Sequence, residues 1–127
     1  MKTLLSCLLL MFIFSIVSFA QNSPNDSTGT VTDIDGNVYQ TVKIGDQWWM
    51  ADNLKVTHYQ NGDSIPHVTD NTQWTNLTTS AYCNYNNDTT NVSTYGRLYN
   101  WAAVVDSRKI APSGWHVSTD EEYTALE

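Results

Sequence analysis

The fold is decided by residues 95–127, which read YGRLYNWAAVVDSRKIAPSGWHVSTDEEYTALE. The first part of this stretch carries apolar residues at the spacing i, i+3, i+4, i+7, namely Leu98, Trp101, Ala102 and Val105. Because this spacing puts side chains on one face of a helix, it predicts a short amphipathic helix. Basic residues within 106–109 suit the C-terminal end of that helix.

The second part of the stretch predicts a turn, a strand and another helix. Residues 112–114 are Pro-Ser-Gly, which favours a turn because proline presets φ and glycine accepts a positive φ. Residues 115–117 then predict a short strand. Thr119, with Glu122 three residues later, has the pattern of a capping box, in which each side chain bonds the other residue's main-chain N–H. A helix should therefore begin after Thr119. Its buried face is expected to hold Tyr123 and Leu126.

The first twenty residues predict a cleaved signal peptide. Residues 4–14 are almost wholly apolar, and Ser18 and Ala20 put small residues at −3 and −1 of a cleavage site after Ala20. A membrane anchor is the first alternative, but the apolar run is marginal for spanning a bilayer. A lipoprotein is the second, but Cys7 precedes most of the apolar run instead of following it. The expected location is secreted, periplasmic or cell-surface, with no membrane contact after cleavage.

Beyond the signal peptide we expect a polar linker over 21–29 and a single small domain over 30–127. The chain has 13 acidic and 6 basic residues, and Lys2 leaves with the signal peptide, so the net charge changes from −7 to −8. This balance argues against nucleic acid as a partner, because phosphate contacts need basic patches. The last predicted helix reaches only about two turns. We therefore expect the domain to be truncated and the helix to continue in a longer protein.

Three strands joined by tight turns are expected near the start of the domain. They cover 30–34, 38–44 and 47–50, with turns at 35–37 and 45–46, and form an antiparallel meander. The middle strand has two alternating faces, Val38, Val42 and Ile44 on one and Tyr39, Thr41 and Lys43 on the other.

The middle of the chain is less regular. Residues 54–60 predict a further strand, 61–63 a turn, 72–79 a single helical turn and 81–85 a short aromatic segment. Residues 86–94 are polar and rich in asparagine, which favours a surface loop.

Trp48 and Trp49 are the candidate ligand-binding residues. Neighbouring residues on a strand point to opposite faces, so one ring is expected in the core. The other ring either packs against a second layer or forms an exposed platform on which a sugar could stack. Two buried aromatic residues are the alternative.

No metal or cofactor site is predicted. The Asp-rich turn at 33–37 resembles the start of an EF-hand loop, but the sixth and twelfth positions hold Val38 and Ile44 where that loop needs Gly and Glu. A hairpin turn is therefore favoured. The histidines have no metal-binding spacing and could share zinc only if the fold brought them together. They are His58, His67 and His116.

No catalytic residue is predicted either. Cys83 would be the only cysteine after signal cleavage, and no neighbour in sequence would stabilise its thiolate. Its disulfide partner would lie in a missing C-terminal part, or it is a buried thiol. The sequence has no nucleophile elbow, zinc-protease motif, P-loop or glycine-rich dinucleotide turn.

Four blocks carry a family resemblance, at residues 33–54, 81–88, 95–104 and 111–127. In order and spacing they resemble the Fibrobacter succinogenes major paralogous domain. The last block is also similar to C-type-lectin-like and formylglycine-generating-enzyme-like domains. The resemblance covers roughly 31–127 and only the N-terminal part of the family domain.

The resemblance implies a bacterial, exported α+β domain of C-type-lectin-like type, with hairpins and two helices around a twisted antiparallel sheet. It also implies a set of core residues, namely Trp48 or Trp49, Tyr99, Trp101, Trp115 and Tyr123. No calcium, sugar or oxidase residue carries over, because those elements lie in the absent half.

Three functions follow as hypotheses. The first is an exported binding module for a glycan, supported by the signal peptide, the resemblance and 12% aromatic residues. The second is a structural or adhesive surface domain that meets a surface protein and has no small ligand. The third, least favoured, is an enzyme of hydrolase or formylglycine-generating type. The oligomeric state and the ligand are left open.

Overall fold

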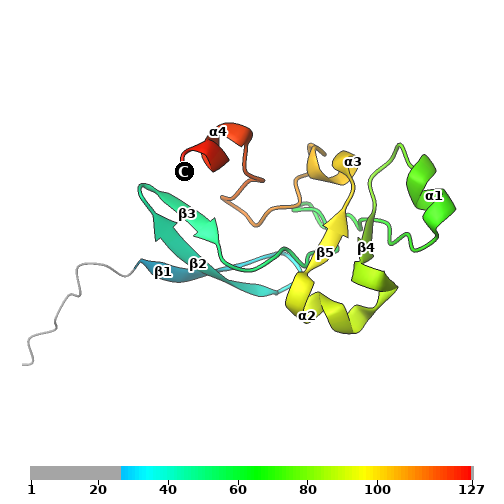
Figure 1. Ribbon diagram of the computed structural model, residues 1–127, viewed down its shortest axis with the longest axis horizontal. Helices are drawn as coiled ribbons and strands as arrows, with labels where there is room; N and C mark the ends of the chain where they lie inside the picture. Colours follow the sequence, from blue (N-terminus) through cyan, green and yellow to red (C-terminus); the bar gives the residue numbers. More distant parts are fainter. Residues whose placement is uncertain (1–26, 127) are drawn as a thin grey trace, which may run out of the picture.

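The structure is a computed structural model that describes residues 27–126 as a small α+β domain (Figure 1). The predicted signal peptide, its cleavage after Ala20 and most of the predicted linker lie outside the described residues. Two separate antiparallel sheets carry the strands, and short helices lie around them. The predicted single sheet with two helices is therefore wrong in its details, although the α+β class is confirmed. Among the described helices, none is long and apolar enough to cross a membrane.

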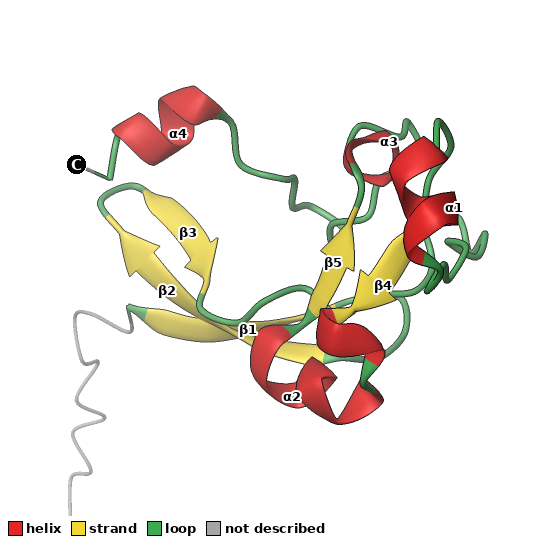
Figure 2. Ribbon diagram, turned by 45° about the vertical axis from the view of Figure 1, so that its right-hand side comes forward, coloured by secondary structure: helices red, strands yellow, loops and turns green. Residues whose placement is uncertain are grey.

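The first sheet has the order β1-β2-β3 (Figure 2). β1 (Thr28–Thr32) pairs with β2 (Val38–Ile44), which pairs with β3 (Gln47–Met50). The meander prediction is confirmed, and the bounds of β2 and β3 match it. β1 begins and ends two residues earlier than predicted, so it includes Thr28 and Gly29 from the expected linker.

The second sheet pairs β4 (Tyr82–Asn84) with β5 (Arg97–Tyr99). Two 3₁₀ turns, η1 (Tyr85–Asn87) and η2 (Thr89–Asn91), and the short helix α2 (Val92–Tyr95) connect these strands. The connection is largely exposed, as the polar composition predicts, but it is built of tight helical turns.

Three further helices are short. α1 (Asn71–Asn76) fills the position of the predicted single turn, and the Asp70 carboxylate accepts a hydrogen bond from the Gln73 N–H at its start. α3 (Trp101–Val104) follows β5, and α4 (Asp120–Thr124) follows the Pro-Ser-Gly turn.

The prediction of one amphipathic helix through Leu98 and Val105 is wrong. Leu98 lies in β5 opposite Cys83, and Trp101 is 76% exposed at the start of α3. The reason is Asn100, which lies between the two elements. Its Oδ1 accepts hydrogen bonds from the N–H groups of Ala103 (3.1 Å) and Ala81 (3.0 Å). Asn100 therefore caps α3 and connects it to the residue that precedes β4.

A close approach of backbone at Gly96 positions β5. Gly96 has a φ of 68°, and a Cβ there would lie 2.6 Å from the Leu54 carbonyl oxygen and 2.7 Å from the Asn53 Cβ. The next residue, Arg97, donates its N–H to the same Leu54 oxygen at 2.9 Å. Only glycine fits this junction without displacing the chain.

The core lies around the second sheet. Its buried members contact Leu54, Tyr99 and Val104, and they are Val56, Tyr59, Ile65, Tyr82, Ala103 and Ile110. Of the predicted core residues, Tyr99 packs against this cluster, but Trp101 is exposed and Tyr123 is 59% exposed. Leu126, predicted on a buried helix face, is also exposed.

Two predicted strands are absent from the described chain. Residues 54–60 are extended, but they form only one isolated bridge, between His58 and Ser64. Side chains instead of a neighbouring strand donate hydrogen bonds to the main-chain carbonyls of this segment. Arg97 Nε donates to the Lys55 carbonyl, and the Tyr99 hydroxyl donates to the Val56 carbonyl. Residues 115–117 pair with no described strand.

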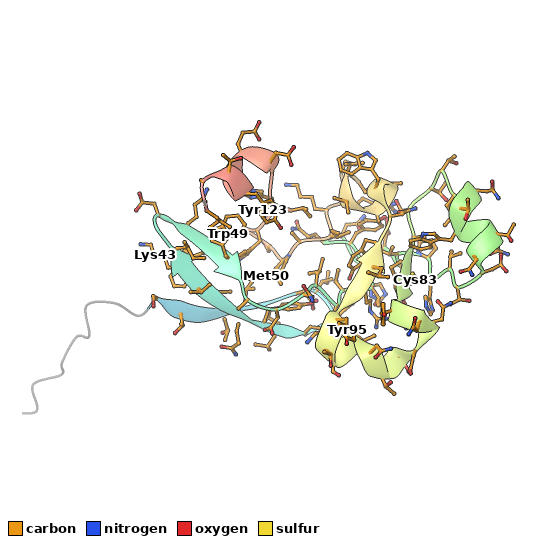
Figure 3. All side chains as sticks on the ribbon, in the orientation of Figure 1. Lys43, Trp49, Met50, Cys83, Tyr95 and Tyr123 are labelled. Carbon is orange, nitrogen blue, oxygen red and sulfur yellow. The ribbon has the colours of Figure 1, made fainter. Side chains whose placement is uncertain are left out.

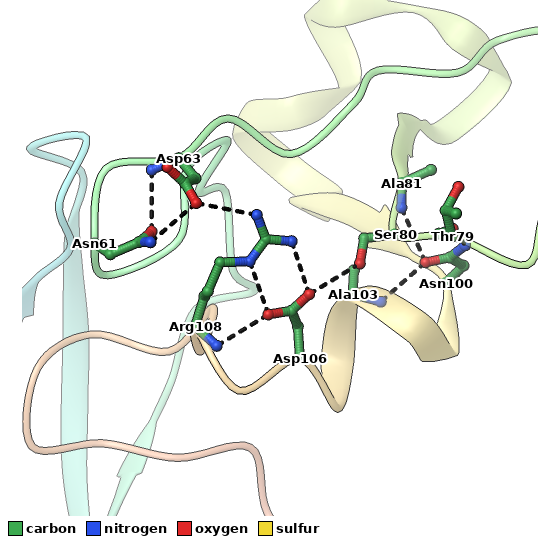
Figure 4. A network of polar contacts seen from close by, with 9 residues as sticks. All are labelled: Asn61, Asp63, Thr79, Ser80, Ala81, Asn100, Ala103, Asp106 and Arg108. Atoms are coloured by element: carbon green, nitrogen blue, oxygen red, sulfur yellow. Dashed lines mark hydrogen bonds and ion pairs between the residues drawn. The ribbon is translucent and has the colours of Figure 1, made fainter.

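A network around Arg108 fixes the chain after α3 (Figure 4). The guanidinium bonds both carboxylate oxygens of Asp106 and reaches Asp63 at 3.1 Å. It also lies over the Tyr59 ring, 4.0 Å from the centroid. These hydrogen bonds hold the pKa of Asp106 well below its usual range. The expected helix-end role of this basic residue is thus replaced by a contact between distant segments.

Candidate functional site

A cleft of about 540 Å³ lies between β3 and the segment 114–123. Its aromatic lining comes from both sides, with Trp49 on β3 and Trp115 and Tyr123 on the other segment, and Trp48 also borders it. Its polar lining includes Gln47, Asp52, Asn53, His116, Ser118 and Glu122. The volume lies within the range of about 300–1,000 Å³ that is typical of small-molecule sites.

Trp49 and Tyr123 face each other across this cleft (Figure 3). Their ring centroids are 5.5 Å apart and their planes are tilted by 51°. Such a tilted pair is a favourable aromatic arrangement. It connects α4 to β3 although neither ring is fully buried.

Trp48 lies on the other face of β3, as the strand alternation predicts. Across the sheet Trp48 is opposite Lys43, whereas Trp49 is opposite Val42. The Trp48 ring reaches over Gly29 of β1, whose missing side chain leaves the space, and it remains 44% exposed. Trp48 is thus neither a core residue nor a ring that faces Tyr123.

The start of α4 forms the acidic rim of the cleft. Thr119 Oγ1 accepts from the Glu122 N–H at 3.2 Å, and Glu122 Oε2 accepts from the Thr119 N–H at 2.8 Å, so the predicted capping box is confirmed. The other oxygen of Glu122 lies 2.8 Å from His116 Nε2. The Thr119 N–H and His116 together lower the pKa of Glu122, which keeps this carboxylate ionised.

The opposite rim is also polar. Asp52 accepts a hydrogen bond from the Gln40 N–H at 2.7 Å, which fixes its carboxylate after the end of β3. The indole N–H of Trp49 is buried and has no partner among the described residues. The cleft therefore combines aromatic rings with acceptor groups held in place by the fold.

The Asp-rich turn at 33–37 is a hairpin turn, as predicted. Asp33 accepts from Asn37 N (2.9 Å), from Asn37 Nδ2 (2.8 Å) and from the Tyr39 hydroxyl. Asp35 accepts from the Thr57 hydroxyl (2.8 Å), and its other oxygen lies 2.6 Å from His58 Nδ1. Protein donors therefore occupy these carboxylates. Within 27–126, no three His, Cys, Asp or Glu side chains converge as metal ligands do.

Cys83 forms no disulfide within the described part of the chain. It lies half-buried in β4, opposite Leu98 (Figure 3). Burial raises the pKa of its thiol, so the reactive thiolate is disfavoured.

The sequence predicts Trp48 and Trp49 as site residues, but the family resemblance places Trp115 and Tyr123 in the core. Trp115 and Tyr123 are separated from β3 by more than sixty residues, so no local pattern brings them to it. No pattern in the sequence pointed to Asp52 as a rim residue. A signal for Glu122 existed in the capping box, although it pointed to helix structure and not to a site.

Comparison with known proteins gives one result. A family model described as Fibrobacter succinogenes major domain matches residues 42–127. The chain belongs to the Fibrobacter succinogenes major domain family. No curated protein and no solved structure matches the chain.

Proposed function

We propose that this chain is the binding module of an exported bacterial protein and that the cleft between β3 and residues 114–123 is its ligand site. The observation that carries the proposal is the meeting of aromatic rings from distant segments, Trp49 on one side and Trp115 and Tyr123 on the other. Rings that remain partly exposed in a cleft offer apolar surface to a ligand.

The proposed ligand is a carbohydrate. A sugar ring has apolar C–H faces that stack on aromatic rings and hydroxyl groups that donate to carboxylates and amides. Asp52, Asn53 and Glu122 supply such groups at the rim. Because the rim residues Asp52 and Glu122 are both acidic, neutral or amino sugars are expected to bind better than uronic acids.

We also propose that the chain is an exported domain of the C-type-lectin-like class. The hairpin followed by a capped helix supports a C-type-lectin-like domain, and the apolar N-terminal sequence supports export. The formylglycine-type enzyme is less favoured because the pKa of Cys83 is raised and burial keeps its thiol protonated.

Immobilised mono- and oligosaccharides, probed with the purified chain, test this proposal. Binding of at least one neutral or amino sugar should weaken about tenfold in Trp115→Ala, since a stacked aromatic ring contributes roughly 0.5–1.5 kcal/mol beyond its buried area. Trp101→Ala is the matched control, because Trp101 is exposed and does not line the cleft. Equal losses in both variants, or no binding by any glycan, would remove the basis of the carbohydrate proposal.

An adhesive or structural surface domain is the second candidate. It is favoured by large apolar side chains that are exposed away from the cleft, Trp101 above all, with Leu98 and Val105. Crosslinking on intact cells should then yield one protein partner, and Trp101→Ala should abolish the crosslink. A crosslink that persists in this variant would argue against the role of this surface.

A further inference from the structure

β3 is an edge strand whose outer main chain faces the cleft. Among the described residues 27–126, β3 pairs with β2 on one side and with no strand on the other. The Ala51 N–H donates to the Gln40 carbonyl, which identifies 40 and 51 as a hydrogen-bonded pair of the ladder. Hydrogen-bonded pairs alternate along an antiparallel ladder. The main-chain N–H and C=O groups of Trp49 therefore point toward β2, while those of Trp48 and Met50 point outward.

The hydrogen bonds between β2 and β1 lead independently to the same assignment of inward and outward main-chain groups. The Lys43 N–H donates to the Ser27 carbonyl, so the main chain of Lys43 faces β1. The main-chain groups of the neighbouring Val42 must then point toward β3, where Val42 is opposite Trp49. Both observations leave the N–H and C=O groups of Trp48 and Met50 without a ladder partner in the described part of the chain.

The cleft runs along this free edge. All four residues of β3, which are consecutive, line it. Side chains of consecutive strand residues alternate between the two faces of the sheet, so all four can border one cleft only where it follows the strand edge. The cleft therefore presents main-chain hydrogen-bonding groups next to the Trp49 and Tyr123 rings.

Nothing in β3 itself blocks strand addition. Edge strands are commonly protected by charged residues, proline or a bulge. β3 reads QWWM, which contains no charge and no proline, and its pairing with β2 is regular over all four residues. Such an edge is a template for a further strand.

A second copy of the chain fits this edge poorly. If two copies exchanged main-chain hydrogen bonds between Trp48 of one and Met50 of the other, the antiparallel register would place Asp46 opposite Asp52 at both ends. Like charges directly opposite each other are destabilising in a sheet. The chain also has a net charge of −7, which opposes self-association.

We propose that the free edge of β3 takes up an extended segment of another protein, with a short apolar run flanked by lysine or arginine. Basic residues at the two ends would face Asp46 and Asp52, while every second residue of the run would contact the Trp49 and Tyr123 rings. This inference uses the same cleft as the carbohydrate proposal but does not rest on it. A bound strand would cover Trp49 and would exclude a stacked sugar.

The probe is a heptapeptide with blocked ends, Lys-Val-Thr-Val-Thr-Val-Lys, titrated into the ¹⁵N-labelled chain. Residues 46–52 and 115–123 should show the largest amide shifts. Met50→Pro removes an outward N–H without touching the ladder to β2, so it should weaken binding about tenfold while the spectrum stays folded. Trp101→Ala should bind as the wild type does.

Charge reversal gives a second test in case Met50→Pro fails to fold. The same peptide with glutamate at both ends should bind the wild type at least about fivefold more weakly than the lysine peptide. Asp46→Lys, a change in an exposed turn, should reduce or invert this preference. Saturable lysine-peptide binding that depends on Met50 and Asp46 in these ways would support the proposal.

Several results would overturn it. They are no binding by the lysine peptide at millimolar concentration, equal binding of both peptides, equal binding by a folded Met50→Pro variant, and a dimer formed across β3 in place of the peptide complex. Glycan binding that is lost in Trp115→Ala but kept in Met50→Pro, with no peptide binding, would overturn this inference and leave the carbohydrate proposal standing.

Discussion

At the scale of single residues, Tyr39 connects the first sheet to the rest of the domain. Its ring is fully buried, and its hydroxyl donates to the Asp33 carboxylate and accepts the Lys55 N–H at 2.9 Å. Burial and the nearby Asp33 carboxylate raise the pKa of Tyr39, so the hydroxyl keeps its proton. One side chain thus satisfies a buried acid and a main-chain donor from different segments.

Tyr39→Phe is expected to lower the free energy of unfolding by about 2 kcal/mol, because it leaves a buried carboxylate and an N–H each short of a partner. Urea unfolding measures this loss. Tyr95→Phe is the matched control, since Tyr95 is half exposed and its hydroxyl bonds no described residue. Losses of equal size in the two variants would contradict the proposed role of the Tyr39 hydroxyl.

Asp35 should make stability depend on pH. Burial raises the pKa of this carboxyl, but hydrogen bonds from the Thr57 N–H and hydroxyl, and His58, outweigh burial and lower it overall. A carboxyl whose pKa is lowered by folding stabilises the protein above its unfolded pKa of about 4, and this contribution is lost as the pH falls through the folded pKa.

The stability advantage of the wild type over Asp35→Asn should therefore be complete near about pH 6 and should shrink below about pH 4. Urea midpoints of both proteins across this range give the measurement. A difference that stays constant with pH would show that the ionised form of Asp35 contributes nothing specific.

At the scale of elements, the backbone contact at Gly96 sets where β5 can lie. Gly96→Ala should be strongly destabilising, because the new Cβ would meet the Leu54 oxygen and the Asn53 side chain in addition to the cost of positive φ. Gly62→Ala provides the control, since Gly62 has a φ of 90° and nothing within 4 Å of the added atom.

Urea unfolding should show a loss of about 1 kcal/mol for Gly62→Ala and at least about twice that for Gly96→Ala. Similar losses in the two variants would mean that β5 can move away from the 53–54 segment at little cost.

The elements that the sequence predicts well are those specified by local chemistry. β2, β3 and the turn between them were placed correctly because Gly45 and the alternating pattern determine a hairpin, and the capping box at Thr119 determines the start of α4. The predicted helix through Leu98 was wrong because its apolar spacing was accidental. Asn100 divides that segment by bonding residues some twenty positions away, which no local pattern reveals.

At the scale of the whole molecule, the core forms where the sequence is least regular. Residues 54–65 supply Val56, Tyr59 and Ile65 to it although they form no strand in the described chain beyond an isolated bridge. Their extended backbone depends on side-chain donors from β5, a tertiary effect. The aromatic residues that seemed suited to the core, Trp101 and Tyr123, are largely exposed instead.

The candidate site could be predicted only in part for the same reason. The adjacent tryptophans in β3 are visible in the sequence, and their opposite orientations follow from strand geometry. Their neighbours across the cleft, Trp115 and Tyr123, come from a segment without strand pairing, so only the tertiary structure brings the rings together.

The most direct test of the central claim, that this cleft binds the ligand, uses the indole N–H signals of the five tryptophans. The ¹⁵N-labelled chain is titrated with the glycan that gives the strongest signal in the immobilised panel. The Trp49 and Trp115 signals should shift together with one dissociation constant, while those of Trp74 and Trp101, which do not line the cleft, stay in place. Shifts confined to Trp74 or Trp101, or no saturable shift in any indole signal, would contradict the account.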